Sequence, residues 1–125
     1  MKVSAETKYW IEARYGGDPP TRRAHHVSFI HDGKMYVHGG EDLFEGILGS
    51  MYALSFEFMK SHEVPPCWEL ITPGNSKLAP GPLSHHSVCI YNNAAYLLGG
   101  LKPNGSSSND LYKYDIAGNK WEVAR

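Results

Sequence analysis

The sequence predicts an all-β protein built from two copies of one repeat. Each copy contains a His-His pair, a strand-like run, a Gly-Gly doublet and a tyrosine, and every one of these features recurs at an offset of sixty residues. The first set is His25-His26, Gly39-Gly40 and Tyr52, and the second is His85-His86, Gly99-Gly100 and Tyr112. A fixed period of this size indicates a repeat architecture. The 13 glycines, 8 prolines and 12% aromatic content also favour strands and turns over helices.

The first copy, over residues 22–71, predicts four strands joined by turns. We expect these strands at residues 26–30, 35–38, 51–56 and 67–71. The dipeptide Asp32-Gly33 favours a tight hairpin turn between the first two strands. A polar, glycine-containing loop over residues 41–50 leads to the third strand.

The second copy, over residues 83–124, repeats this order. Its strands are expected at residues 86–91, 95–98, 110–115 and 120–124, with turns at 92–93 and 117–119. Each copy therefore predicts a four-stranded antiparallel meander. One spacing differs, because Tyr52 and Trp68 are sixteen residues apart whereas Tyr112 and Trp121 are nine apart. The seven extra residues of the first copy are expected around 57–66.

One further strand is expected near the N-terminus. Residues 9–13 form a short strand candidate that begins with Tyr9-Trp10. The cluster of glycine, aspartate and proline over residues 16–20 follows it and is typical of a break in secondary structure.

The spaced features of both copies resemble the kelch repeat, whose units are the blades of a β-propeller. The resemblance is carried by the Gly-Gly doublets after a hydrophobic strand, a tyrosine twelve residues beyond, and a tryptophan that begins the last strand. The run Arg23-Ala24-His25-His26 is also similar to the Arg-x-x-His pattern of the family, whereas Leu83 replaces the arginine in the second copy.

This resemblance covers roughly residues 9–125. It implies a kelch-type β-propeller segment in a single domain over residues 1–125. The segment would consist of an N-terminal strand (9–13) and two four-stranded antiparallel blades (22–71 and 83–124).

Most of the repeated residues have a structural explanation. Glycines at a strand end allow neighbouring sheets to approach closely. We expect Trp68 and Trp121 to be core residues, with Tyr52 and Tyr112 packed on them across the strands.

The seven histidines are the most evident candidates for chemistry. Adjacent residues of a strand point to opposite faces, so neither His25-His26 nor His85-His86 can chelate one metal ion through both side chains. No metal ligand is predicted on this basis. We expect His26 and His86 instead to bond to turns between the blades.

The sequence shows no set of residues for catalysis. Ser84 and Ser87 flank the second histidine pair, but a nucleophile needs a base and an orienting group close in space. There is no Gly-x-Ser-x-Gly elbow and no glycine-rich phosphate loop with its lysine. The chain is predicted to be non-catalytic and to need no cofactor. Because some kelch-like propellers are enzymes, an enzyme whose site lies mostly outside this chain stays an alternative.

Charge and hydropathy argue against two classes of partner. The net charge of −1 argues against nucleic acid, which requires a basic surface. No apolar run approaches the roughly twenty residues of a membrane span, and the start of the chain lacks the hydrophobic segment of a secretory signal. We therefore expect a cytoplasmic protein in which Cys67 and Cys89 stay reduced.

Most kelch proteins bind other proteins through their loops, so the resemblance implies a protein-interaction scaffold or adaptor. The candidate contact residues are Glu41, Asp42, Phe44, Leu48, Phe58, Met59 and His62. They combine aromatic and methionine side chains with charge, as interfaces do. The alternative that these loops fold their apolar residues onto their own blade stays open. Substrate recognition in a ubiquitin ligase, which usually needs a BTB or F-box segment, is a further alternative.

Two blades do not by themselves close a propeller. They would expose two long sheet edges and two open faces. The extra N-terminal strand argues against a ring of three chains, because each chain would carry this strand in addition to its two four-stranded blades. We expect instead that the chain belongs to a longer propeller or docks on a larger assembly.

Overall fold

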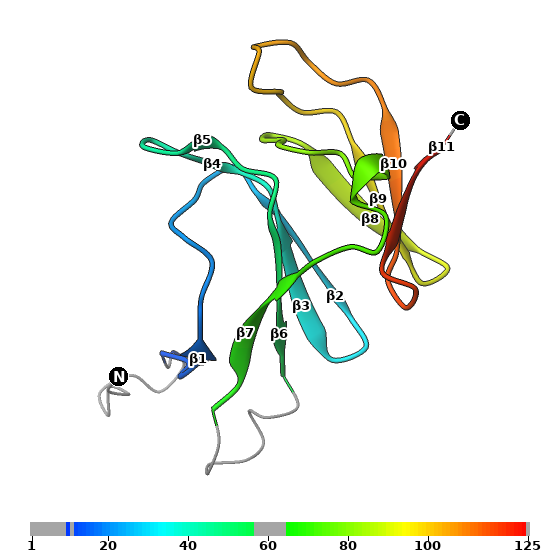
Figure 1. Ribbon diagram of the computed structural model, residues 1–125. Coiled ribbons are helices and arrows are strands. Elements are labelled where there is room, and N and C mark those ends of the chain that lie inside the picture. The colour runs from blue at the N-terminus through cyan, green and yellow to red at the C-terminus, as the bar shows by residue number, and fades with distance from the viewer. Residues whose placement is uncertain (1–9, 11, 57–64, 125) are drawn as a thin grey trace.

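Two antiparallel sheets form the body of the protein in the computed structural model, which describes residues 10, 12–56 and 65–124 (Figure 1). Blade 1 comprises β2 (Val27–His31), β3 (Lys34–His38), β6 (Met51–Ser55) and β7 (Cys67–Ile71). Blade 2 comprises β8 (Ser87–Tyr91), β9 (Ala94–Leu98), β10 (Leu111–Asp115) and β11 (Lys120–Ala124). Neighbouring strands within each blade are antiparallel. This confirms the predicted all-β fold with two four-stranded meanders.

Three smaller features lie outside the two meanders. β1 (Gly16–Gly17) pairs in parallel with β7 at the edge of blade 1. β4 (Glu41–Asp42) and β5 (Gly46–Ile47) form a separate hairpin, which projects from the end of the molecule opposite to the β2–β3 turn (Figure 1). A turn of 3-10 helix, η2 (Ser76–Leu78), lies in the connection from blade 1 to blade 2.

The N-terminal pairing lies further along the chain than the sequence predicts. The described residues of 9–13 belong to no strand, and Trp10 among them is 80% exposed. Pairing with β7 occurs instead at Gly16 and Gly17. Gly17 has a φ of +75°, and a Cβ there would lie 2.7 Å from the carbonyl oxygen of Trp68. The glycines that predict a break therefore make this close pairing possible.

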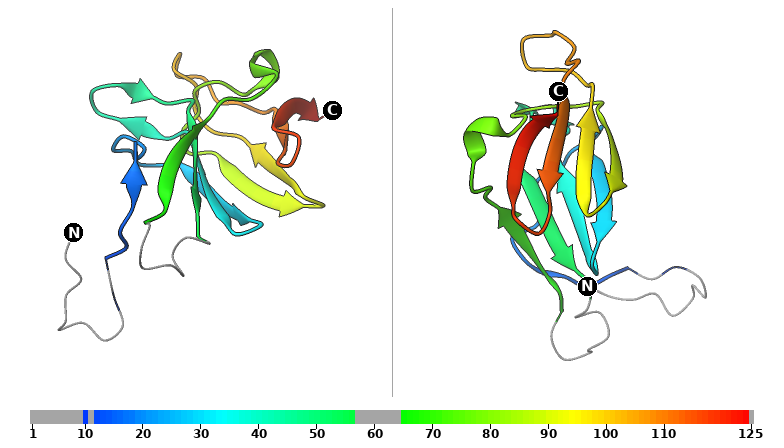
Figure 2. Two further views of the ribbon diagram at one scale, coloured as in Figure 1. Left: turned by 60° about the horizontal axis from the view of Figure 1, so that its bottom comes forward. Right: turned by 90° about the vertical axis from the view of Figure 1, so that its right-hand side faces the viewer.

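The two blades pack face against face, as the two views of Figure 2 show. Residues opposite one another on antiparallel strands share a face of the sheet. Blade 1 contributes Phe29, Tyr36, Met51 and Ala53 to the buried cluster between the blades, and blade 2 contributes Ala95, Leu97, Tyr114, Ile116 and Trp121. The core of the protein therefore lies between the two sheets.

The tryptophans of the last strands occupy different environments. Trp121 is 3% exposed, and its ring centroid lies 4.8 Å from that of Tyr114, its partner across β10 and β11. Trp68 is only half-buried, and its ring meets Tyr15 edge-on at 6.5 Å. Trp121 is thus a core residue as expected, but its partner is Tyr114 rather than Tyr112. The two tryptophans differ in burial because the face of blade 2 that carries Trp121 packs against blade 1, whereas no further blade covers the equivalent face of blade 1 among the described residues.

Hydrogen bonds between the blades supplement the apolar core. The side chain of Asn75 accepts from the backbone N–H of Trp121 at 2.8 Å and donates to its carbonyl oxygen at 2.6 Å. The Asn119 side chain donates to the carbonyl oxygen of Thr72 at 2.8 Å. Asn75 therefore provides the partners that the backbone of Trp121 would otherwise lack at the exposed edge of β11, and Asn119 links the turn before β11 to the connection between the blades.

Gly39 permits the close approach of blade 2. Its φ is +71°, and a Cβ there would lie 2.7 Å from Cε1 of His86 and closer still to the carbonyl oxygen of Leu83. Gly99 holds the same place in the second copy with a φ of +76°, yet its nearest neighbour is the Ser108 carbonyl oxygen at 4.0 Å. Both glycines fit the left-handed backbone, but only Gly39 is required by the contact between blades.

Candidate functional site

The β4–β5 hairpin has an exposed apolar tip on an anchored base. Leu43 and Phe44 at the tip are 98% and 84% exposed. At the base, Glu41 and Ala24 exchange backbone hydrogen bonds of 2.8 and 3.0 Å. The backbone N–H of Leu48 donates to the carbonyl oxygen of Gly40 at 2.8 Å.

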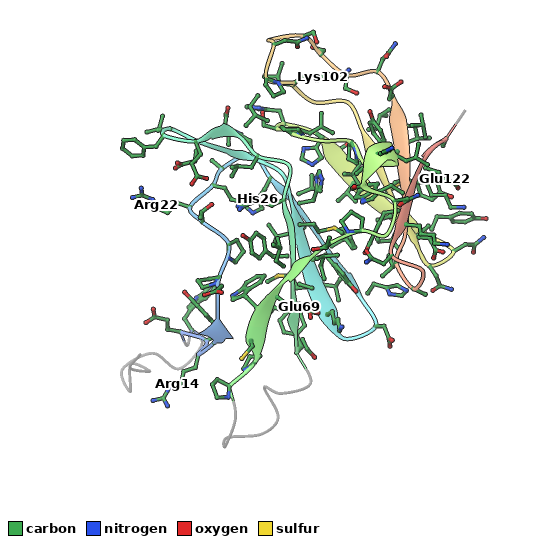
Figure 3. All side chains as sticks on the ribbon, viewed as in Figure 1. Arg14, Arg22, His26, Glu69, Lys102 and Glu122 are labelled. Atoms are coloured by element: carbon green, nitrogen blue, oxygen red, sulfur yellow. The ribbon has the colours of Figure 1, made fainter. Side chains whose placement is uncertain are left out.

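Polar contacts fix the tip of this hairpin. The carboxylate of Asp42 accepts hydrogen bonds of 3.2 Å from the backbone N–H groups of Phe44 and Glu45, which forms an Asx-type turn. The guanidinium carbon of Arg22 lies 5.8 Å from the centroid of the Phe44 ring. Arg22 and the hairpin lie on the same side of the molecule (Figure 3).

The structure separates the predicted contact residues into three groups. Glu41 and Asp42 lie at the start of the hairpin and Phe44 at its exposed tip. Leu48 is half-buried at the base, where its carbonyl oxygen accepts a 3.2 Å hydrogen bond from the N–H of Leu83 in blade 2. Phe58, Met59 and His62 lie outside the described residues, as do most of the seven extra residues predicted around 57–66.

His25 and His85 lie side by side beneath the hairpin. Their imidazole rings stack with centroids 3.8 Å apart and planes 18° apart. The backbone N–H of His85 donates to the carbonyl oxygen of His25 at 2.9 Å, so the two blades are joined here. Nε2 of His25 lies 3.8 Å and Nε2 of His85 lies 3.9 Å from Oε1 of Glu41. One residue from each copy and one from the hairpin thus form a single cluster.

The His-His pairs do not reveal this cluster when each pair is considered within its own strand. The relevant pairing is between copies, since His25 and His85 have the same repeat position in adjacent blades. Residues at one repeat position lie near one another when repeats stack side by side. The recurrence of a histidine at an offset of sixty residues is therefore the sequence signal that points to this cluster.

A second histidine pair is buried directly between the blades. Nδ1 of His38 and Nε2 of His86 are 3.1 Å apart, and the His38 ring also packs 5.6 Å from Trp121. Burial, followed by the nearby His86 and Arg23, lowers the pKa of His38 from 6.5 to about 3. Burial, followed by His26 and His85, lowers the pKa of His86 to about 4. Both imidazoles are therefore neutral at physiological pH.

The expected role of the second histidine of each pair is corrected in part. His86 does link the blades, but its partner is the side chain of His38 on β3 rather than a turn. His26 is exposed. The two residues differ because His86 faces a neighbouring blade, whereas the residues described around His26 include the N-terminal segment and no further blade.

The arginine and leucine at the start of the two copies also have different roles. Arg23 donates hydrogen bonds to the carbonyl oxygen of Gly39 at 3.0 Å and to Oγ of Ser50 at 3.3 Å. Its guanidinium also lies 5.4 Å from the centroid of the Tyr52 ring. Leu83 is 1% exposed between the blades. This position of the repeat therefore carries a polar residue, Arg23, in blade 1 and an apolar residue, Leu83, at the junction between the two blades.

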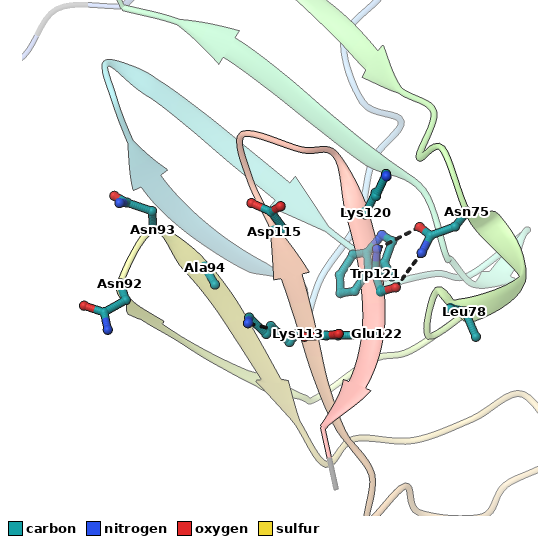
Figure 4. Close-up of a pocket in the computed structure, with 10 residues that line it drawn as sticks. All are labelled: Asn75, Leu78, Asn92, Asn93, Ala94, Lys113, Asp115, Lys120, Trp121 and Glu122. Atoms are coloured by element: carbon teal, nitrogen blue, oxygen red, sulfur yellow. Dashed lines mark hydrogen bonds and ion pairs between the residues drawn. The ribbon is translucent and has the colours of Figure 1, made fainter.

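An open concavity lies on blade 2. It has a volume of about 460 Å³ and lies beside Asn75, Trp121 and the charged side chains of Lys113, Lys120 and Glu122 (Figure 4). Lys113 and Glu122 form an exposed ion pair of 3.3 Å across β10 and β11. The concavity is therefore lined in part by charged side chains, of which Lys113 and Glu122 are paired with each other.

Two other expectations concern the cysteines and the membrane. Cys67 and Cys89 are both free and exposed in the structure. Among the described residues, no helix has the length and apolar character to cross a bilayer.

Two four-stranded meanders packed face to face, each with a Gly-Gly doublet after its second strand, define a repeat protein of the β-propeller class. The family model described as the KLHDC2/KLHL20/DRC7 Kelch-repeats domain matches residues 1–125. The chain therefore belongs to the kelch-repeat family, as its sequence predicts.

Curated relatives are long proteins of which this chain matches a small part. Kelch repeat-containing protein 2 of Saccharomyces cerevisiae is 31% identical over 116 residues, covering 88% of this chain and 12% of that protein. Kelch domain-containing protein 3 of Homo sapiens is 28% identical over 105 residues, covering 83% and 25% respectively. Ras guanine nucleotide exchange factor F of Dictyostelium discoideum is 27% identical over 117 residues, covering 93% and 10%. The chain thus spans between a tenth and a quarter of the length of these relatives.

Proposed function

We propose that this chain is a non-catalytic protein-interaction module whose β4–β5 hairpin contacts a partner protein. The observation that carries the proposal is the pair Leu43 and Phe44, which present almost their whole apolar side chains to solvent. Neighbouring exposed apolar residues are typical of interaction sites, and aromatic side chains are enriched among the residues that dominate binding energy.

The anchoring of the hairpin supports this proposal. Asp42 fixes the backbone of the tip, and Arg22 lies against the Phe44 ring. A loop already held in one conformation loses less entropy when a partner binds. The tip is thus suited to insert a preformed apolar pair into a partner.

The charges around the tip indicate the chemistry of this partner. Glu41, Asp42 and Glu45 surround the two apolar residues along the hairpin. Complementary charge increases the association rate and excludes wrong partners. We therefore expect an apolar pocket bordered by lysine or arginine on the partner protein.

A photo-crosslinking experiment tests the proposal. A photoreactive amino acid is placed at position 44 in cells of the source organism, and the crosslinked protein is identified, purified and titrated against the chain. Replacing Leu43 and Phe44 by serine should weaken that binding by about 30-fold or more, as expected for hot-spot residues. Leu70→Ser changes another exposed leucine, on β7, and is the matched control. If the Leu43 and Phe44 variant bound the partner as tightly as the Leu70→Ser control, a role for the hairpin would be refuted.

The outer face of blade 2 supports a second contact, with a further propeller blade. Tyr91 and Leu98 on this face are 67% and 51% exposed. They lie sixty residues after His31 and His38, which lie on the face of blade 1 that meets blade 2. The outer face of blade 2 therefore corresponds to the face of blade 1 that blade 2 covers, and a next blade could pack on it in the same way. This contact agrees with the expectation that the chain docks on further blades or a larger assembly.

A further inference from the structure

We propose that His25, Glu41 and His85 form a binding site for a divalent transition-metal ion of the Zn²⁺ type at the junction between the blades. The candidate ligand atoms, one from each residue, all lie within 4.8 Å of one another. Two imidazole nitrogens and one carboxylate oxygen make up a donor set that proteins use for zinc, with the fourth position left to water. Magnesium and calcium prefer oxygen ligands alone, so the two nitrogens favour zinc or a neighbouring late transition metal.

Hydrogen bonding orients one of the ligands. Nδ1 of His85 lies 3.1 Å from Oγ of Ser84, a residue that is fully buried. This contact occupies Nδ1 and leaves Nε2, the nitrogen nearest Glu41, to bind the ion. For Nε2 to bind the ion, Nδ1 carries the proton and donates a hydrogen bond to Oγ of Ser84, just as the second ring nitrogen of metal-binding histidines generally donates to a neighbouring acceptor.

The backbone holds the three residues together before any ion binds. His25 and His85 are joined by the 2.9 Å backbone hydrogen bond, and Glu41 is paired with Ala24 next to His25. Both histidines adopt the left-handed backbone, with φ of 59° and 60°. A residue with a side chain is strained in this region, and such strain is concentrated at functional sites. The repetition of this conformation in both copies presents the two rings side by side.

Small side-chain rotations would complete the coordination. The ligand atoms around a tetrahedral ion lie roughly 3.3 Å apart, given metal–ligand distances of about 2.0–2.1 Å. Each Nε2 is now 3.8 or 3.9 Å from the carboxylate oxygen, so the stacked rings must tilt until their nitrogens converge. The side chains of His25, His85 and Glu41 are 52%, 41% and 37% exposed, which leaves room for this movement.

The position of the site gives it a structural consequence. His25 precedes β2 of blade 1, His85 precedes β8 of blade 2, and Glu41 begins the β4–β5 hairpin. One ion would therefore link both blades and the base of the hairpin. Because the three residues come together only in the folded chain, the ion should stabilise the folded state by mass action.

A zinc titration of the untagged chain tests the site. Zinc sulfate is titrated at pH 7.5, and we expect saturable binding of one ion per chain. His25→Gln, His85→Gln and Glu41→Gln should each weaken binding by at least tenfold. His26→Gln and His31→Gln change histidines outside the cluster and should bind zinc as the native chain does. The proposal would be overturned if the native chain showed no saturable binding of zinc, or if the three cluster variants bound zinc as tightly as the native chain.

A second measurement does not depend on the folding of any variant. In the native chain, zinc should shift the imidazole proton resonances of His25 and His85 and raise the melting temperature, and EDTA should reverse both changes. The resonances of His31 should be unaffected. Shifts confined to other histidines would contradict the proposed site even if zinc binds.

Discussion

The two blades share one strand order, but the same face of each sheet meets a different environment. In blade 1 this face carries Phe29 and His38, which are almost completely buried against blade 2. In blade 2 the same positions are Cys89 and Leu98, and both are exposed. Position in the repeat therefore sets the direction of a side chain, whereas the neighbouring blade decides whether it is buried.

The largest expected effect concerns the two equivalent tryptophans. Trp121→Ala should lower the free energy of unfolding by about 3–5 kcal/mol, because it leaves a cavity between the blades beside Tyr114 and His38. Trp68→Ala should cost only about 1–2 kcal/mol, because Trp68 is half-buried at the outer strand. Urea denaturation of both variants measures the difference. Equal losses would mean that the face between the blades is not the main core.

The two glycines at the end of the second strand provide a closely matched test. Gly39→Ala and Gly99→Ala introduce the same left-handed strain, but only the first places a methyl group against blade 2. Gly39→Ala should therefore destabilise by about 1–3 kcal/mol more than Gly99→Ala, which is the usual cost of overpacking. Thermal melts of the two variants are compared. A Gly99→Ala variant that is the less stable of the two would contradict the observed packing of the blades.

The stability of the protein should fall as the pH is lowered from about 6.5. His38 has a folded-state pKa of about 3, below the 6.5 of the unfolded chain, so the unfolded state binds the proton first. Stability from this residue is complete above about pH 6.5 and is lost by about 1.4 kcal/mol per pH unit as the pH falls toward about 3. The titratable groups that affect His38 are the buried His86 and the half-buried Arg23, and the lowered pKa of His86 acts in the same direction.

Replacing His38 by leucine, the residue at the same position in blade 2, separates this contribution from the others. His38→Leu should reduce the slope of stability against pH between about 6 and 4, measured by urea denaturation in EDTA. His26→Gln, which changes an exposed histidine, should keep the native slope. An unchanged slope in His38→Leu would show that His38 does not carry the pH dependence.

The smallest expected effect is on the outer face of blade 2. Leu98→Asn should change the stability of the chain by no more than about 0.5 kcal/mol, because the side chain is half exposed. If this face is covered by a further blade in a longer protein, the same substitution should be markedly more destabilising there. Denaturation of the chain and of any longer form that contains it measures the difference.

The two meanders could be predicted from the sequence because their signals are local. Runs of apolar and aromatic residues bounded by turn residues mark the strands, and the dipeptide Asp32-Gly33 favours the hairpin that is observed between β2 and β3. The exposed hairpin tip was also predicted in part, since Phe44 follows an acidic pair in a polar loop. The N-terminal pairing was misplaced, because β1 depends on the close approach of Gly17 to β7 rather than on strand propensity.

The sequence by itself determined the all-β fold, the repeat and the place of each strand within a blade, because these follow from patterns a few residues long and their recurrence. Only the tertiary structure decided which face of each blade is buried, why Gly39 has no room for a methyl group while Gly99 does, and which histidines meet. His25 and His85, and likewise His38 and His86, come together through packing between blades. Such contacts join residues 48 to 60 positions apart and depend on the angle and distance between two sheets, which no local pattern encodes.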